Sequence, residues 1–366
     1  MERLQEFLQS TETITKINAL QEQVAKTIFT WPALTGKEKL KRGIKKYILM
    51  RKLPPMDHYF WPNALLAGGL SEILNGAWDN RSAKTLEAYF DKWIKKGMPL
   101  YYVDNVANGM PLLDLYESSR KEKYLNAAER LAAWLEACPR DEQGNLPYRV
   151  RDISHIYADG IGMICPFLCR YGILKGEESL VKLGVVQIVH FLDHAMDEAT
   201  GLPYHGYDSA SGVKYGCVGW GRAVGWLMGG IAESLEQLPA NTPQVPFMQD
   251  HFRALARAAI ARQRQDGSFA WLLPAVDGPA DSSATAMIAC ALLIGEQNGL
   301  FEGEEAESVT RSVLAAARFL LSCIQNGRVE QCSAECEGFA QYPQRYAAYP
   351  WSDGPTLKLF GRMEEV

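Results

Sequence analysis

Several large classes of protein are excluded by what the 366-residue sequence lacks. No apolar run reaches the roughly 18 residues that a membrane-spanning helix requires. The first residues, Met1 to Glu6, are charged and do not contain the apolar core of a secretory signal. Lys and Arg total 38 against 43 Asp and Glu, a formal charge of −5, which offers no basic face to a nucleic acid. We therefore expect a cytoplasmic protein that binds neither membranes nor nucleic acids.

Cysteine pairs and nucleotide motifs are also missing. The eight cysteines include no Cys-x-x-Cys pair and are scattered along the chain, which predicts reduced thiols. Cys332 and Cys336 lie close together, but no histidine follows them at zinc-finger spacing, so we predict no metal site there. No Gly-x-Gly-x-x-Gly or phosphate loop occurs.

Strand patterns are nearly absent, whereas a short sequence motif is repeated along the chain. Asp141 to Tyr148 and Asp197 to Tyr204 are almost the same sequence, with a glycine followed by an apolar residue, proline and tyrosine. Looser versions surround other glycines, so that the repeated glycines are residues 97, 144, 201, 267 and 327. Glycines that recur in the same short motif are typical of a repeated structural unit.

Two types of helix alternate around this motif. Amphipathic helices that end at a glycine cap are predicted before it, at residues 124–137, 180–196, 247–264 and 309–324. Helices that are apolar nearly all round are predicted after it, at residues 65–74, 107–116, 160–171, 223–235 and 284–294, with a short last one at 355–360. Amphipathic helices belong in an outer layer and fully apolar helices in a buried one.

About six such pairs favour a closed ring over an open stack, because the inner layer is apolar and the repeats differ in length. We therefore predict an all-α fold, a single (α/α)6 barrel over residues 1–366, in which residues 1–55 pack as the first outer helices. The alternative is an open helical-repeat scaffold, whose repeats would be more uniform and whose ends would need polar caps.

In such a ring the N-terminal ends of the inner helices meet at one mouth of the barrel. Acids, histidines and aromatic residues precede those helices, in residues 57–61, 101–105, 155–159, 219–222 and 281–283. Each acid has a simple alternative role as an N-cap, and for Asp281 we adopt it. As a set, however, the residues are typical of a carbohydrate cleft, where a carboxylic acid among aromatic side chains retains its proton.

Helix N-termini also favour an anion, and Arg222 and Arg149 would suit an acidic sugar. Trp134 lies within an outer helix and is predicted to belong to the core. Four tryptophans beside the loops remain open as core residues or sugar platforms: Trp61, Trp220, Trp226 and Trp351.

His205 lies in a glycine-containing loop without apolar periodicity, which indicates a role in positioning or proton transfer. His190 and His194 lack the His-Glu-x-x-His pattern of a zinc enzyme and are predicted to lie at the surface. The basic run from Lys37 to Lys52 is predicted to be a solvated helix face.

The chain resembles the unsaturated rhamnogalacturonyl hydrolases, glycoside hydrolase family 105, over roughly Trp61 to Trp351. The elements Asp-x-x-x-Met-x-x-Pro-Phe-Leu, starting at Asp159, and Trp-x-Arg-x-x-Gly-Trp, starting at Trp220, are the most specific. Further matching segments are residues 104–109, 112–116 and 205–208. The sister family 88, the unsaturated glucuronyl hydrolases, is the alternative. Ala158 departs from the aromatic or β-branched residue common before the catalytic acid.

The resemblance implies a glycosidase that releases a 4-deoxy-4,5-unsaturated uronic acid from lyase-generated rhamnogalacturonan oligosaccharides by hydrating the enol ether. Asp159 matches the catalytic acid, which would protonate C4, and Asp104 the second acid. His205, Arg222 and Trp226 match substrate-binding positions, and Arg149 is a weaker match. The implied substrate is a small acidic oligosaccharide, with neither metal nor organic cofactor, and the chain would be a monomer or homodimer.

Two other functions remain open. A non-catalytic helical-repeat scaffold would not depend on an acid at the mouth. A sugar epimerase or isomerase on the same barrel would need paired histidines there, and His205 has only His58 and His155 as candidate partners.

Overall fold

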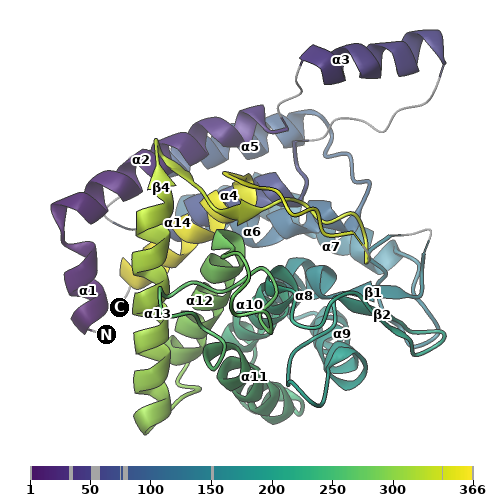
Figure 1. Ribbon diagram of the computed structural model, residues 1–366. Helices are drawn as coiled ribbons and strands as arrows, with labels where there is room; N and C mark the ends of the chain where they lie inside the picture. The colour runs from purple at the N-terminus through teal and green to yellow at the C-terminus, as the bar shows by residue number, and fades with distance from the viewer. Residues whose placement is uncertain are drawn as a thin grey trace.

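The computed structural model describes residues 2–32, 36–50, 58–74, 76, 81–149, 152–339 and 341–364. Helices dominate these parts of the chain and form two concentric layers (Figure 1). The inner helices are α4 (Trp61–Glu72), α6 (Gly109–Ser119), α8 (Ala158–Lys175), α10 (Gly221–Gln237), α12 (Ser282–Gln297) and α14 (Pro350–Glu364). The outer helices are α2 (Thr11–Thr30), α5 (Ser82–Lys95), α7 (Glu122–Ala137), α9 (Glu178–Ala195), α11 (Val245–Ile260) and α13 (Gly303–Cys323).

The inner helices form a closed ring, because α14 packs against α4 while neighbours pack in chain order from α8 to α14. The fold is the predicted (α/α)6 barrel. Small residues allow the close approach that closes it: a Cβ on Gly69 of α4 would lie 2.5 Å from the carbonyl oxygen of Gly354 in α14. The last inner helix is longer than the predicted 355–360, since Pro355 lies within the helix and does not start it.

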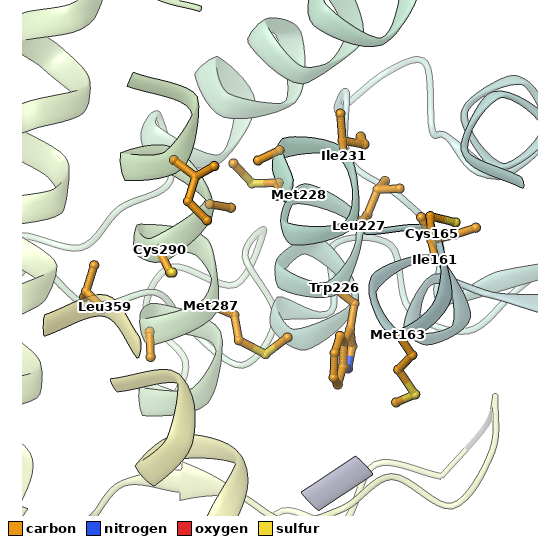
Figure 2. Packing of buried hydrophobic residues seen from close by; sticks show 14 of the residues in the cluster. Ile161, Met163, Cys165, Trp226, Leu227, Met228, Ile231, Met287, Cys290 and Leu359 are labelled. Atoms are coloured by element: carbon orange, nitrogen blue, oxygen red, sulfur yellow. The ribbon is translucent and has the colours of Figure 1, made fainter. Parts of the chain in front are cut away.

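Larger apolar side chains fill the space between adjacent inner helices (Figure 2). Trp226 and Leu227 of α10 lie between Ile161 of α8 and Met287 of α12, and all four are buried. A Cβ on Gly162 would lie 2.5 Å from the Trp226 ring, so a glycine is required where α8 meets that indole. The inner layer thus fixes the position of Trp226.

The repeated glycines adopt positive φ angles, at 76° for Gly97, 85° for Gly144, 69° for Gly201, 87° for Gly267 and 72° for Gly327. Only Gly97 lies directly after its helix, where its N–H donates to the Ile94 carbonyl at 2.9 Å. The other four occupy turns beyond the helix ends, so the prediction of a glycine cap at each helix was wrong. The helices end before these turns, and in several of the turns an aspartate side chain accepts a backbone N–H. Asp141 Oδ1, for example, accepts from the N–H of Asn145 at 2.7 Å.

Short strands supplement the helices, although strand patterns were nearly absent from the sequence. Strands β1 (His155–Tyr157), β2 (Gly206–Asp208) and β3 (Lys214–Tyr215) form an antiparallel sheet in that order, with Tyr157 opposite Gly206. Strand β4 (Ile324–Gln325) pairs with β5 (Arg328–Val329), and β6 (Cys332–Ser333) with β7 (Tyr346–Ala347). Two or three residues carry too little alternation to be recognised from sequence.

The N-terminal region packs only in part. Helices α1 (Glu2–Leu8) and α2 contact α14, as expected for first outer helices. We expected residues 1–55 to pack in this way, but α3 (Gly36–Gly43) and a π-helical turn (Ile44–Ile48) stand apart from the barrel (Figure 1). The apolar side chains described in these two elements face solvent, with Ile48 71% exposed. Residues 33–35 and 51–57, and with them the end of the basic run, lie outside the described residues.

All eight cysteines are free, as their scattered spacing predicts. Trp134 is half-buried and packs against the core, as predicted. No helix in the described parts of the chain combines the length and the apolar character needed to cross a bilayer.

Candidate active site

A cavity of about 460 Å³, open to solvent on one side, lies where α4, α8 and α10 begin. Seven of the nine site residues expected from the sequence line it: Trp61, Arg149, Asp159, His205, Trp220, Arg222 and Trp226. Tyr148, Tyr157, Glu335, Cys336 and Gly338 complete the lining. The cavity therefore combines two arginines, two acids and a histidine with several aromatic side chains.

Asp159 is the second residue of α8 and is 13% exposed. It does not cap the helix, because Tyr157 holds the N-cap position and its side chain makes no cap bond. Instead, Asp159 Oδ2 lies 3.0 Å from Nε2 of His205. The backbone fixes this pair, since the N–H of Ala158 donates to the His205 carbonyl at 3.0 Å beside the β1–β2 register. The capping alternative thus does not apply to Asp159.

His205 is 1% exposed and uses both ring nitrogens. Its Nδ1 lies 2.9 Å from the hydroxyl of Tyr342, and its ring centre lies 4.5 Å from that of Trp220. The Tyr342 hydroxyl also accepts a bond from the backbone N–H of Cys217 at 3.4 Å. A chain of hydrogen bonds therefore runs from the Asp159 carboxyl through His205 to Tyr342.

Asp104 lies in the 3-10 helix η3 (Val103–Asn108) at the same mouth. Burial raises the pKa of its carboxyl to about 6; the charges of Asp159 and Glu335 add to this, while Tyr148 and Arg149 oppose it. Its Oδ1 is buried and has no hydrogen-bond partner among the described residues. Asp104 does not line the cavity itself, yet it is close enough to Asp159 for the two carboxyl groups to interact electrostatically.

Arg222 is the second residue of α10 and is 2% exposed. Its Nη1 donates to Ser333 Oγ at 2.6 Å and its Nη2 to the Ala334 carbonyl at 2.7 Å, while the guanidinium carbon lies 4.7 Å from the centre of the Trp220 ring. Asp281 Oδ2 lies 3.6 Å from Nη1. Arg222 therefore holds the β6 segment at the mouth, and part of its guanidinium is already occupied by protein acceptors.

Asp281 is the N-cap of α12, as predicted, and its side chain accepts from the N–H of Ser283 at 2.9 Å. It also accepts from Ser333 Oγ at 2.6 Å and forms the ion pair with Arg222. Asp281 is fully buried, and besides capping the helix it balances the charge of the buried Arg222. The sequence did not indicate this second role.

The tryptophans divide into two groups. Trp61, Trp220 and Trp226 line the cavity, with the rings of Trp61 and Trp226 6.4 Å apart and nearly perpendicular. Trp351 is 2% exposed and packs behind Trp61 at 5.0 Å, where its Nε1 donates to the Ser333 carbonyl at 2.9 Å. Trp351 therefore supports the aromatic wall without lining the cavity.

A loop between β6 and β7 brings residues to the site that the sequence analysis missed. Glu335 and Cys336 line the cavity, and the Phe339 ring stacks on Tyr157 with ring centres 3.9 Å apart. Partial desolvation, which is the largest cause, raises the pKa of the Glu335 carboxyl although its side chain stays exposed. No repeated motif marks this segment, and its density of aromatic residues and glycine in a long connection is the only signal.

The other histidines lie elsewhere. His190 is half-buried with Nδ1 2.8 Å from Asn145 Oδ1, and His194 is exposed. His58 Nδ1 lies 2.6 Å from the Trp31 carbonyl, and His155 packs on Phe339. Among the described residues that line the cavity His205 is the only histidine, which removes the support for a two-histidine epimerase. No group of three or more potential metal ligands occurs in the described ranges.

A barrel of paired helices whose mouth holds two interacting carboxyl groups, a carboxyl-bound histidine and aromatic side chains is an arrangement suited to an enzyme that acts on carbohydrates. Comparison with known families agrees with this class. The model of Glycosyl Hydrolase Family 88 matches residues 38–363, and the chain belongs to that family.

The chain is also similar to individual proteins of known sequence or structure. Protein Atu3128 of Agrobacterium fabrum is 32% identical over 175 residues, which cover 45% of this chain and 72% of the relative. A structure described as a possible member of the GH105 family, from Klebsiella pneumoniae subsp. pneumoniae MGH 78578, has a TM-score of 0.82 at 18% identity and covers 96% of this chain and 93% of its own. An unsaturated glucuronyl hydrolase specific for heparin has a TM-score of 0.74 at 16% identity, covering 97% and 96%.

Proposed function

We propose that the protein removes a 4-deoxy-4,5-unsaturated uronic acid from the non-reducing end of lyase-generated oligosaccharides of rhamnogalacturonan, a pectic polysaccharide. The observation that carries this proposal is the pair of Asp159 and Asp104 beside the aromatic cavity, in a chain that belongs to a family of glycosyl hydrolases. The eight free cysteines fit action in a reducing compartment such as the cytoplasm.

In this proposal Asp159 first acts as an acid. It transfers its proton to C4 of the double bond, which leaves positive charge shared by C5 and the ring oxygen. Asp159, now a carboxylate, takes a proton from a water molecule that adds to C5, so that the acid is restored. The resulting hemiketal opens and releases the neighbouring sugar, and the net reaction consumes one water and the alkene.

The neighbouring residues have distinct tasks. His205 donates to Asp159 Oδ2 and fixes the plane of the carboxyl group. Asp104, with its raised pKa, binds a sugar hydroxyl or orients the water beside Asp159. The uronate carboxylate is bound by Arg149, which is exposed at the rim of the cavity. It is also bound by those guanidinium N–H groups of Arg222 that do not donate to protein acceptors.

The preference for rhamnogalacturonan products rests on the resemblance of the Asp159 and Trp220 segments to family 105. Unsaturated glucuronyl disaccharides from glycosaminoglycans are the alternative substrates, and the heparin-specific relative is similar to the chain over nearly its whole length.

Purified protein should be given unsaturated rhamnogalacturonan, chondroitin and heparin disaccharides, with the saturated galacturonyl-rhamnose disaccharide as control. We expect kcat/KM to be highest for the rhamnogalacturonan product and no turnover of the saturated control. Higher kcat/KM for a glycosaminoglycan product would contradict the substrate assignment, and no turnover of any unsaturated disaccharide would contradict the proposed reaction.

A further inference from the structure

We propose that Tyr342 is a positioning residue that fixes the proton of His205 on Nε2 and thereby leaves Oδ1 of Asp159 as the oxygen that carries the transferable proton. This inference rests on the proposed function for its catalytic consequence, but not for the hydrogen-bond arrangement itself. It starts from the two contacts of the Tyr342 hydroxyl, at 2.9 Å to His205 Nδ1 and 3.4 Å to the Cys217 nitrogen.

The direction of each bond follows from the groups involved. A backbone N–H can only donate, so the Tyr342 oxygen accepts from Cys217, and His205 Nδ1 is the one acceptor that the described residues offer to the proton of this hydroxyl. Burial raises the pKa of the Tyr342 hydroxyl far above its usual range, so the group stays protonated. His205 Nδ1 is then an acceptor, and the proton of the neutral ring lies on Nε2.

That tautomer determines what His205 can do for Asp159. An Nε2–H group donates to Oδ2 at 3.0 Å and cannot accept a proton from it. When Asp159 is protonated, its proton must therefore lie on Oδ1, for which the described residues provide no partner. In the opposite tautomer the lone pair of Nε2 would bind a proton on Oδ2 and hold it away from the substrate.

The surroundings are built to hold Tyr342 against His205. The loop before Cys217 passes close by because Gly216 has a φ of 84°, and a Cβ at this position would lie 2.5 Å from His205 Cβ and 2.6 Å from the Tyr342 hydroxyl. The Tyr342 ring also packs on Trp220, with ring centres 5.3 Å apart.

The substitution Tyr342→Phe tests the proposal, with Tyr346→Phe as the matched control. Tyr346 lies in the same connection, and its hydroxyl bonds to the exposed side chain of Gln344 at 2.9 Å. Because a histidine in the wrong tautomer cannot support its partner, we expect Tyr342→Phe to lower kcat at least about tenfold while KM changes less than about twofold. Tyr346→Phe should retain wild-type kinetics.

Nitrogen NMR of protein labelled at its histidines supplies a readout that needs neither substrate nor turnover. The His205 signals, assigned from the spectrum of His205→Asn, should show a protonated Nε2 and an unprotonated Nδ1 in the wild type, and a shift toward the Nδ1–H form in Tyr342→Phe. A wild-type signal from Nδ1–H would overturn the proposal, whether or not the variant folds. Unchanged kcat and unchanged nitrogen shifts in a folded Tyr342→Phe would overturn it as well. If the nitrogen shifts are as expected but no unsaturated disaccharide reacts, the proposed reaction fails and the tautomer assignment stands.

Discussion

Asp159 and Asp104 share the mouth of the barrel but have different surroundings. The Asp159 carboxyl contacts His205 and faces the cavity, whereas Asp104 is half-buried and its buried Oδ1 has no partner among the described residues. Two neighbouring carboxyl groups in unequal environments are what acid catalysis with a separate orienting group requires.

Replacing Asp159 by asparagine removes the proton donor but retains an oxygen that can accept from His205. We expect kcat on the unsaturated disaccharide to fall at least about a hundredfold. The melting temperature and the binding of the disaccharide should stay near wild type, and Asp193→Asn on the exposed face of α9 serves as control. Near wild-type turnover by Asp159→Asn would remove Asp159 from the role of acid.

Asp104 provides a prediction about pH. The pKa of its carboxyl is raised from its ordinary 3.8 to about 6 by burial, so the folded protein binds this proton more tightly than the unfolded chain. The contribution of this group to stability is therefore complete below about pH 4 and is lost as the pH rises to about 6. We expect Asp104→Asn to raise the melting temperature relative to wild type at pH 8, with the difference shrinking toward pH 4. A difference independent of pH would contradict a raised pKa.

Arg222→Lys keeps the charge but loses the planar arrangement of donors that reaches Ser333 and Ala334. Leaving these buried acceptors unpaired should cost about 2 kcal/mol of unfolding free energy. Because the same loop lines the cavity, KM for the unsaturated disaccharide should rise as well. Chemical denaturation measures the unfolding free energy and steady-state kinetics measures KM. Wild-type values of both would show that the planar arrangement of the Arg222 donors is dispensable.

At the scale of elements, close packing of glycine explains how the ring closes. Gly69 and Gly68 are adjacent in α4, but a Cβ on Gly69 would lie 2.5 Å from a backbone oxygen of α14, whereas one on Gly68 would meet nothing within 4 Å. We expect Gly69→Ala to destabilise the fold by about 1–3 kcal/mol through overpacking. Gly68→Ala should leave stability unchanged or raise it by about 0.5–1 kcal/mol. Thermal unfolding of the two variants makes the comparison, and equal stabilities would contradict close contact at this junction.

The sequence predicted these helices because their periodicity depends on many residues at once. Predicted residues 160–171 and 223–235 lie within α8 and α10, and the paired layers follow from which helices have a polar face. The β6–β7 loop could not be placed in this way, because its position at the mouth depends on the Arg222 bonds to Ser333 and Ala334, between residues more than a hundred positions apart. The contact between Tyr342 and His205 could not be predicted for the same reason, because these residues are also far apart in the sequence.

The positions of two cavity-lining residues could be predicted for a related reason. Asp159 is the second and Trp226 the sixth residue of an inner helix, so closure of the ring brings both to one mouth. Trp351 also belongs to an inner helix, but its rotation about that helix turns it behind Trp61. Which face a side chain occupies at a helix end is set by packing, which a pattern of residue types does not resolve.

At the scale of the whole molecule, the barrel presents one mouth with acids, arginines and aromatic rings in a chain of net charge −5. Arg149 and Arg222 supply local positive charge at this mouth, which suits an anionic sugar in an otherwise acidic protein. The reaction that we propose for this mouth is a hydration, which differs from ordinary glycoside cleavage in consuming an alkene.

The proposed hydration is tested most directly by the reaction in heavy water with an unsaturated rhamnogalacturonan disaccharide. Because the proton that Asp159 delivers exchanges with solvent, we predict that the ultraviolet absorbance of the conjugated double bond disappears and that the released uronic acid carries deuterium at C4. Both changes should be lost in Asp159→Asn. Release of rhamnose with the chromophore intact, or cleavage of the saturated disaccharide at a comparable rate, would contradict hydration as the mechanism.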